Sequence, residues 1–340
     1  MHVPGWIWAV TLIGLTGLLI VDLLLVARRP HVPSTRESTL WVSFYVTLAV
    51  LFGLGMWLFW GPKHAGEFYA GWLTEYSLSI DNLFVFVIIM SRFAVPRIYQ
   101  QKVLLIGIVL ALVMRGIFIG LGAAVVERFV WVFYIFGAFL LYTAWKFIKQ
   151  GEPDDSDFKE NALIRWSRRV LPMTKKIEGP HLTEVVNGKR LFTPMIVVMI
   201  ALGTTDLLFA VDSIPAIFGL TRSPFIVFTA NVFALMGLRQ LYFLLGDLLD
   251  RLVYLSIGLA VVLAFIGVKL VLEALHENNV PFINGGDPVH VPHIPIWLSL
   301  LFIVASMGTA AIASLVKSRN DTRRAVRQAE QNGPVSADSV

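Results

Sequence analysis

The sequence contains no cysteine and few charged residues. Asp, Glu, Lys and Arg make up 15% of its 340 residues, whereas a soluble domain carries about 25%. The absence of cysteine excludes a disulfide framework and a thiolate metal site. The low charge and an apolar fraction of 56%, with a mean hydropathy of +0.72, indicate a protein that folds in lipid. In such a protein the location of the positive residues matters more than the net charge of +5, because Lys and Arg set the membrane orientation. We therefore expect no nucleic-acid partner.

Long apolar stretches recur along the whole chain. A helix needs about 20 apolar residues to cross the hydrocarbon core of a bilayer. Nine stretches qualify: residues 5–27, 39–60, 67–91, 103–126, 129–149, 193–220, 224–246, 252–273 and 294–316. The first has no small-residue cleavage site and is followed by Arg28 and Arg29, unlike a signal peptide. The pattern predicts an all-α, polytopic membrane protein of about nine transmembrane helices.

Lysine and arginine lie mainly on alternate sides of these stretches. If the N-terminus is outside, the inner segments hold 21 of these residues and the outer segments hold 3. Because cytoplasmic loops are enriched in Lys and Arg, we expect a multi-pass protein of the cell (plasma or inner) membrane with its N-terminus outside and its C-terminus in the cytoplasm. The polar residues 150–192 then form a cytoplasmic loop, and residues 317–340 a disordered cytoplasmic tail.

Two parts of the chain resemble each other. Thr74-Glu75 followed by Asp81-Asn82 matches Thr205-Asp206 followed by Asp212-Ser213, at an offset of 131 residues, and later matches have an offset of 123. Each unit contains three helices, residues 67–149 and 193–273. Three is an odd number, so the second unit must lie inverted relative to the first, as in many transporters. Two N-terminal helices in residues 1–60 and one helix at 294–316 complete the predicted organisation.

Four acidic residues lie inside the predicted spans: Glu75 and Asp81 in one, Asp206 and Asp212 in another. Each charge costs at least about 2.5 kcal/mol in a membrane, which makes it a functional candidate. At 100° per residue, these acids and their polar neighbours give each helix one continuous polar face. The neighbours are Thr74, Asn82, Thr205 and Ser213.

A proline adds a further oxygen to the second acidic helix. Pro215 has no N–H, so the carbonyl of Val211, beside Asp212, loses its helix partner. Carboxylate, amide, hydroxyl and carbonyl oxygens suit Mg²⁺, Ca²⁺ or Mn²⁺ better than Zn²⁺ or Cu⁺. The predicted metal ligands are Glu75, Asp81, Asn82, Asp206, Asp212 and Ser213. The ligand type alone does not distinguish the three hard ions.

Two arginines, Arg115 and Arg239, lie within spans at nearly equivalent places of the two units. Four acids and two arginines leave a charge of −2, which one divalent cation would balance. The alternative is that all six residues form structural ion pairs, and for the arginines alone that alternative is favoured. Asn231 either faces the same cavity or forms an interhelical hydrogen bond. Asp22, near the inner end of the first span, is expected to reach the interface.

The two acidic segments resemble the signature segments of the TerC/Alx family of bacterial membrane proteins. They are Thr74-Glu75-Tyr76-Ser77-Leu78-Ser79-Ile80-Asp81-Asn82 and Phe209-Ala210-Val211-Asp212-Ser213-Ile214-Pro215-Ala216-Ile217-Phe218. The likeness extends from the first span to the ninth. Some family members carry another acid where this chain has Gly203. The resemblance implies a LysE-like transporter associated with Mn²⁺ efflux, and it supports the six ligands named above.

The function predicted from these patterns is transport of a divalent cation, with Mn²⁺ efflux implied by the resemblance and protons as the expected counter-ion. The transported ion is the expected ligand, and no covalent cofactor is expected. The main alternative is a membrane scaffold acting in tellurite resistance or in metal loading of exported proteins, both of which the resemblance also implies. An oxyanion pathway along the arginines is less compatible with four flanking carboxylates. The chain contains no hydrolase, zinc-protease or phosphate-loop motif, so we do not expect an enzyme.

Overall fold

The computed structural model describes residues 3–28, 32–93, 95–129, 131–150, 182–186, 189–245, 254–278, 280, 283–292 and 294–331. Within these ranges some helical side chains are not described, among them those of Asp81, Val211 and Asp212. The description below refers to these parts of the chain.

Helices account for nearly all of the described residues. They are α1 (Gly5–Arg28), α2 (Thr35–Trp60), α3 (Pro62–Arg92), α4 (Arg97–Arg128), α5 (Val132–Gln150), α7 (Pro194–Phe218), α8 (Pro224–Leu235), α9 (Leu238–Leu245), α10 (Leu255–His276) and α11 (Ile296–Gln331). Eight spans are long and apolar enough to cross a membrane, with α8 and α9 counted as one, and Pro194–Leu207 of α7 is a shorter apolar stretch. The predicted all-α, polytopic membrane fold is confirmed.

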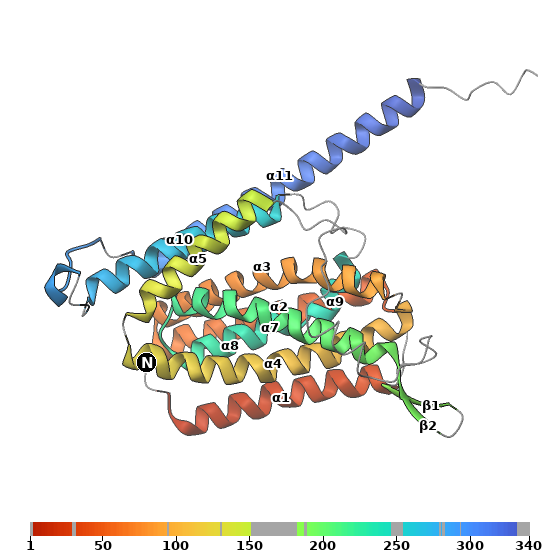
Figure 1. Ribbon diagram of the computed structural model, residues 1–340, viewed down its shortest axis with the longest axis horizontal. Helices are drawn as coiled ribbons and strands as arrows, with labels where there is room; N and C mark the ends of the chain where they lie inside the picture. Colours follow the sequence, from red (N-terminus) through yellow and green to blue (C-terminus); the bar gives the residue numbers. More distant parts are fainter. Residues whose placement is uncertain are drawn as a thin grey trace, which may run out of the picture.

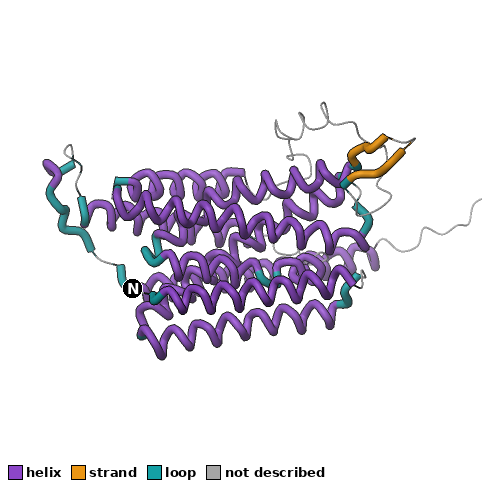
Figure 2. The backbone as a smooth tube through the Cα atoms, turned by 90° about the horizontal axis from the view of Figure 1, so that it is seen from below, coloured by secondary structure: helices purple, strands orange, loops and turns teal. Residues whose placement is uncertain are grey.

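The helices form two groups that lie against each other (Figure 1). One group contains α1, α2, α3, α4, α7, α8 and α9, and the other contains α5, α10 and α11. Most helices run nearly parallel to one common direction (Figure 2). Small residues allow the closest approach, between α5 and α10: a Cβ atom built on Gly137 would lie 2.9 Å from the backbone oxygen of Gly267. Close backbone packing of this kind is typical of helices in lipid.

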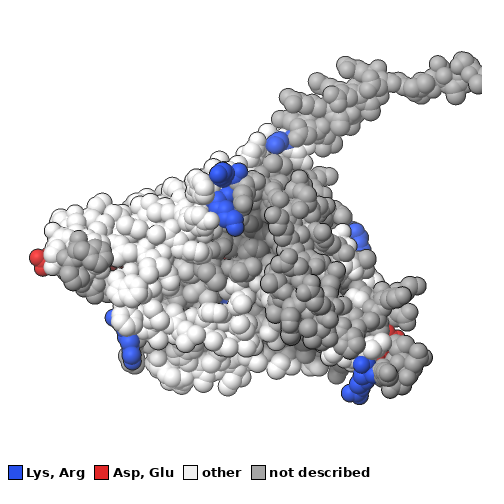
Figure 3. Space-filling view, viewed as in Figure 1, with Lys and Arg blue, Asp and Glu red and all other residues white. Residues whose placement is uncertain are grey.

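The outer surface of the bundle matches a lipid environment. On the face drawn in Figure 3, charged side chains form small isolated groups on a largely uncharged surface. Four of the five exposed tryptophans among the described residues lie at the end of the bundle where α3 begins, Trp6, Trp57, Trp131 and Trp297, whereas Trp145 lies near the far end of α5. Tryptophan prefers the interface between hydrocarbon and headgroups, so this end lies at one membrane surface.

The span predicted at residues 224–246 is interrupted. Helix α8 ends at Leu235 and α9 begins at Leu238, because Gly237 has a φ angle of +86°, which a right-handed helix cannot contain. By contrast, α7 continues through Pro215 as one element from Pro194 to Phe218. The break therefore lies between α8 and α9, whereas the sequence indicated a local opening in the preceding helix, α7.

The two polar segments also contain regular structure. Two strands lie within the predicted cytoplasmic loop, and β1 (Thr183–Val186) pairs antiparallel with β2 (Lys189–Phe192). Helix α11 continues to Gln331, so the prediction of a disordered tail from residue 317 is wrong over 317–331. The reason is that this stretch is rich in Ala, Arg, Gln and Glu, which favour helix, and contains no glycine or proline before Gly333.

The inverted repeat stays a prediction, although the helix contacts are compatible with it. Helix α3 runs opposite to α7: Lys63 at the start of α3 and Phe218 at the end of α7 line one cavity, whereas Met90 and Met195 share a cluster at the other end. Each helix of the first unit also contacts its proposed counterpart, in the pairs α3–α7, α4–α8 and α5–α10. A pseudo-two-fold axis in the membrane plane would produce this pairing.

Candidate metal-transport site

Arg115 is the centre of a polar cluster in the middle of the bundle. It projects from α4 and is 1% exposed. Its Nη1 atom forms an ion pair with Glu75 Oε1 of α3. The same nitrogen donates to Asn231 Oδ1 of α8 at 2.9 Å, and Nη2 donates to Asp206 Oδ1 of α7 at 3.1 Å. One guanidinium thus joins four helices, and its two carboxylate partners come from the two acidic helices.

The positions of these residues follow from the antiparallel packing of α3 and α7. Glu75 and Asp206 each lie near the middle of their helix, so two antiparallel helices bring them to the same depth. Apolar clusters on both sides of this level hold the helices together. Without Arg115, two buried carboxylates would lie close together in a medium of low dielectric constant, at a large cost in free energy.

Buried oxygens of the two acidic helices, α3 and α7, extend from this cluster along the bundle. Glu75 Oε2, Thr74 Oγ1 and Ser213 Oγ have no hydrogen-bond partner among the described residues. Asn82 and Thr205 are buried as well. Buried polar oxygens without a partner are rare in native proteins. Glu75 and Thr74 therefore offer unused oxygen atoms at the Arg115 level, and Ser213 offers one about 10 Å further along α7, beside Asp212.

The other two acids lie further along the same helices. The side chains of Asp81 and Asp212, and that of Val211, lie outside the described part of the structure. Their backbone positions are six residues beyond Glu75 and Asp206, which corresponds to about 9 Å along a helix axis. Because α3 and α7 are antiparallel, Asp81 and Asp212 are displaced in opposite directions from the Arg115 level. The four acids are thus spread along the bundle axis.

Gly203 packs too closely to be replaced by an acid without rearrangement. A Cβ atom built on Gly203 of α7 would lie 2.8 Å from Leu110 Cδ2 of α4. A carboxylate side chain would require Leu110 to move. This position therefore contributes close helix packing in this chain.

Arg239 belongs to a different cluster. Its Nη2 atom donates to Asp22 Oδ1 of α1 at 2.7 Å, and both side chains are buried. Asp22 was expected to reach the membrane interface, and this expectation is wrong because the buried Arg239 provides a partner inside the bundle. Arg239 therefore does not count toward the formal charge around Arg115. Glu75, Asp206 and Arg115 sum to −1, and Asp81 and Asp212 would add two negative charges.

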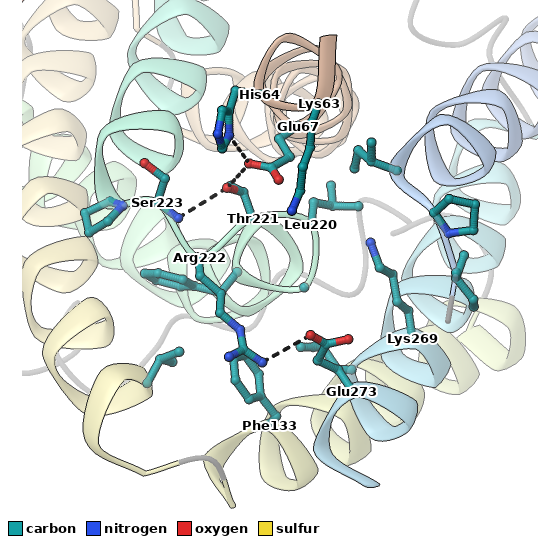
Figure 4. Close-up of a pocket in the computed structure, with 18 of the residues that line it drawn as sticks. Lys63, His64, Glu67, Phe133, Leu220, Thr221, Arg222, Ser223, Lys269 and Glu273 are labelled. Atoms are coloured by element: carbon teal, nitrogen blue, oxygen red, sulfur yellow. Dashed lines mark hydrogen bonds and ion pairs between the residues drawn. The ribbon is translucent and has the colours of Figure 1, made fainter. Parts of the chain in front are cut away.

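Sequence reasoning missed a second group of charged residues, at the end of the bundle where α3 begins. Glu67 accepts from Thr221 Oγ1 at 2.8 Å and lies 3.2 Å from His64 Nδ1. These side chains line a cavity of about 870 Å³, together with Lys63 and Lys269 (Figure 4). The signal in the sequence was Glu67 itself, an acid at the first position of a predicted span. Because it lies at the boundary of that span, it did not count among the acids inside the membrane.

Comparison with known proteins agrees with this architecture. Residues 60–322 match the integral membrane protein TerC family. The chain belongs to the TerC family. The matched region begins just before α3 and includes every residue of the Arg115 cluster, while α1, with Asp22, precedes it.

Relatives of this TerC protein cover almost its whole length. An uncharacterized membrane protein of Mycobacterium tuberculosis strain H37Rv is 46% identical over 97% of this chain and 84% of the relative. An uncharacterized membrane protein of Myxococcus xanthus is 39% identical over 93% and 94% of the two chains. A protein of Escherichia coli K12 with the provisional name membrane-bound redox modulator Alx is 37% identical over 94% and 97%. No solved structure matches the TerC chain significantly.

Proposed function

We propose that this TerC protein transports a divalent metal cation across the membrane, with Mn²⁺ as the first candidate. The observation that carries the proposal is the position of Arg115 between Glu75 and Asp206. Two acids from two antiparallel helices meet at one depth, and among the described residues only Arg115 supplies a positive charge to them. Ionisable residues buried inside a membrane bundle commonly mark the path of an ion.

The ligand chemistry supports a hard cation. The atoms at this level are carboxylate, hydroxyl and amide oxygens. Glu75 Oε2 and Thr74 Oγ1, and Ser213 Oγ further along α7, have no hydrogen-bond partner among the described residues. Oxygen ligands favour Mg²⁺, Ca²⁺ and Mn²⁺. The choice of Mn²⁺ and of efflux as the direction comes from the family resemblance.

The proposed mechanism uses Arg115 as an internal counter-ion. The guanidinium offsets one of the two negative charges of Glu75 and Asp206 when no substrate is bound, and a dication at the unused oxygens would compete with it for these carboxylates. Asp81 and Asp212, displaced toward opposite ends of the bundle, would each receive the ion on one side of this level. Two protons that replace the dication on the carboxylates would leave the charge of the site as it was with metal bound, so the return step would carry no extra negative charge.

The test is metal flux into proteoliposomes that contain the purified full-length protein. Asp206→Asn, Asp81→Asn and Asp212→Asn should each reduce Mn²⁺ flux at least tenfold, whereas Asp287→Asn, in the exposed loop after α10, should not. Competition by Mg²⁺, Ca²⁺ and Fe²⁺ measures selectivity. Retention of wild-type Mn²⁺ flux in all three variants would exclude the proposed site.

Two alternatives remain hypotheses. An oxyanion pathway would need an arginine that is free to bind the anion, but Arg115 contacts two acids and Arg239 contacts Asp22. A scaffold function would depend on residues 150–192, of which the structure describes only Gln150 and residues 182–186 and 189–192. The name of the Escherichia coli relative refers to redox modulation; this chain has no cysteine, so any such effect here would not use a thiol of its own.

A further inference from the structure

The cavity at the start of α3 has a second, independent chemistry. Its volume of about 870 Å³ lies in the range of ligand pockets. Its walls come from α3, α4, α5, α7, α10 and the start of α11, so it lies where the two groups of helices meet. It is separated from the Arg115 level by an apolar layer, in which a Cβ atom built on Gly71 would lie 3.4 Å from both Ala230 and Ile217.

Most charges around the cavity are already paired. Arg222 bridges to Glu273 at 3.2 Å and to Glu277 at 2.7 Å, and Glu67 is held by His64 and Thr221. Lys63 and Lys269 are members of none of these pairs, and Lys269 Nζ donates a long hydrogen bond to Ser299 Oγ at 3.4 Å. Figure 4 shows their ammonium groups turned toward the middle of the cavity from opposite walls. The positive ends of α3 and α8, which begin at Pro62 and Pro224, lie beside them.

This arrangement favours an anion over a metal cation. A cation would have to compete with two ammonium groups for a carboxylate that already has partners, whereas an anion would be attracted by both lysines and by the helix ends. The charge distribution of the cavity lining therefore favours an anion.

The rest of the lining indicates where the anion comes from. Phe133, Phe218, Leu270, Ile296 and Trp297 form much of the wall, and Trp297 is exposed at the membrane surface defined by the other tryptophans. A small soluble anion would leave this apolar surface uncovered, whereas a phospholipid brings a phosphate and an apolar glycerol and acyl region together. We propose that the cavity binds the phosphate group of an anionic phospholipid, with Lys63 and Lys269 on either side of the phosphate.

The experiment measures thermal unfolding of the purified full-length protein in detergent with added lipid. Phosphatidylglycerol should raise the midpoint by about 5 °C at saturation, and phosphatidylcholine and millimolar inorganic phosphate should not. Lys63→Gln and Lys269→Gln should each weaken the phosphatidylglycerol effect about tenfold in concentration, as expected for one lost charged donor. Lys102→Gln, an exposed lysine at the other end of the bundle, should leave it unchanged.

Lys63 is exposed, so its variant is expected to fold even if the partly buried Lys269 is needed for stability. Native mass spectrometry of the Lys63→Gln protein should show fewer bound phosphatidylglycerol molecules than the wild type. An equal effect of phosphatidylcholine, or a phosphatidylglycerol effect that persists in both lysine variants, would overturn the proposal. A shift produced by inorganic phosphate alone would overturn the lipid as the source of the anion. None of these readouts depends on metal transport.

Discussion

Arg115 Nη2 donates to Asp206 Oδ1 at 3.1 Å, although the two residues are 91 positions apart in the sequence. The same side chain pairs with Glu75, so a single arginine is shared by two acids from different helices and leaves one negative charge. This contact joins the two predicted inverted units inside the bundle, where an unpaired charge would be costly.

Replacing Arg115 should destabilise the protein more than replacing its partners together with it. Arg115→Gln leaves Glu75 and Asp206 without a positive partner, and we expect a loss of about 3–5 kcal/mol in the free energy of unfolding. The triple variant Arg115→Gln, Glu75→Gln and Asp206→Asn should regain most of this stability but not transport Mn²⁺. The checks are thermal unfolding in detergent and flux in proteoliposomes. If the triple variant were as unstable as the single one, charge pairing would not explain the effect.

The Asp22–Arg239 pair should influence stability without influencing metal affinity. Asp22→Asn removes one charge of a buried pair whose atoms lie 2.7 Å apart, so the free energy of unfolding should fall by about 3–5 kcal/mol. The concentration of Mn²⁺ at half-maximal flux, measured on the folded fraction, should remain that of the wild type. Asp206→Asn provides the contrast, since it should change the flux. A shift of more than tenfold in the half-maximal concentration for Asp22→Asn would place this pair on the ion path.

The contact between α5 and α10 should not tolerate a side chain at Gly137. A Cβ atom there would lie 2.6 Å from Val271 Cγ2 and 2.9 Å from the backbone oxygen of Gly267. Because this oxygen belongs to the backbone of α10, it can move away only if the helix moves. Gly137→Ala should therefore cost about 1–3 kcal/mol. Gly120→Ala is the matched control in α4, where nothing lies within 4 Å, and helix propensity predicts a gain of up to about 1 kcal/mol. Equal midpoints of thermal unfolding for the two variants would contradict the close approach.

The break between α8 and α9 should depend on glycine. Gly237 has a φ angle of +86° and packs on the ring of Tyr45, with 3.1 Å between a built Cβ atom and Cδ2. Gly237→Ala should lower the free energy of unfolding by about 1–2 kcal/mol, the cost of a left-handed conformation for a residue with a Cβ atom. Gly55→Ala in α2, with open space around it, serves as the control. A neutral Gly237→Ala substitution would mean that the break straightens without cost.

The spans were predictable because their signal is local. A stretch of about 20 apolar residues can be recognised within a single window of the sequence. The boundaries of α2 and α10 lie within a few residues of those predicted. The break in α8–α9 was missed because it depends on the conformation of Gly237, whereas Pro215 in α7 gave a stronger sequence signal for an opening. Pro215 nevertheless lies inside one continuous helix, as prolines in membrane helices can.

The pairing of the polar residues was only partly predictable. Their burial follows from their position inside spans, but partners depend on how distant helices pack. Asp22 and Arg239 are 217 residues apart and Arg115 and Asn231 are 116 apart. The equivalent positions of Arg115 and Arg239 in the two units suggested equivalent partners. In the structure the helix break precedes Arg239 by two residues, and the arginine pairs with α1, which lies outside the repeated units.

Helix α11 continues well beyond its apolar span. Its apolar span takes 23 of its 36 residues, and the remaining 13 extend about 20 Å at the rise of an α-helix. Figure 1 shows this end projecting past the rest of the bundle. A fluorescent domain fused after Gln331 would therefore stand clear of the headgroups. Any tilt of α11 against α3 and α10 during a transport cycle would be magnified into a displacement that distance measurements between two fluorophores can follow.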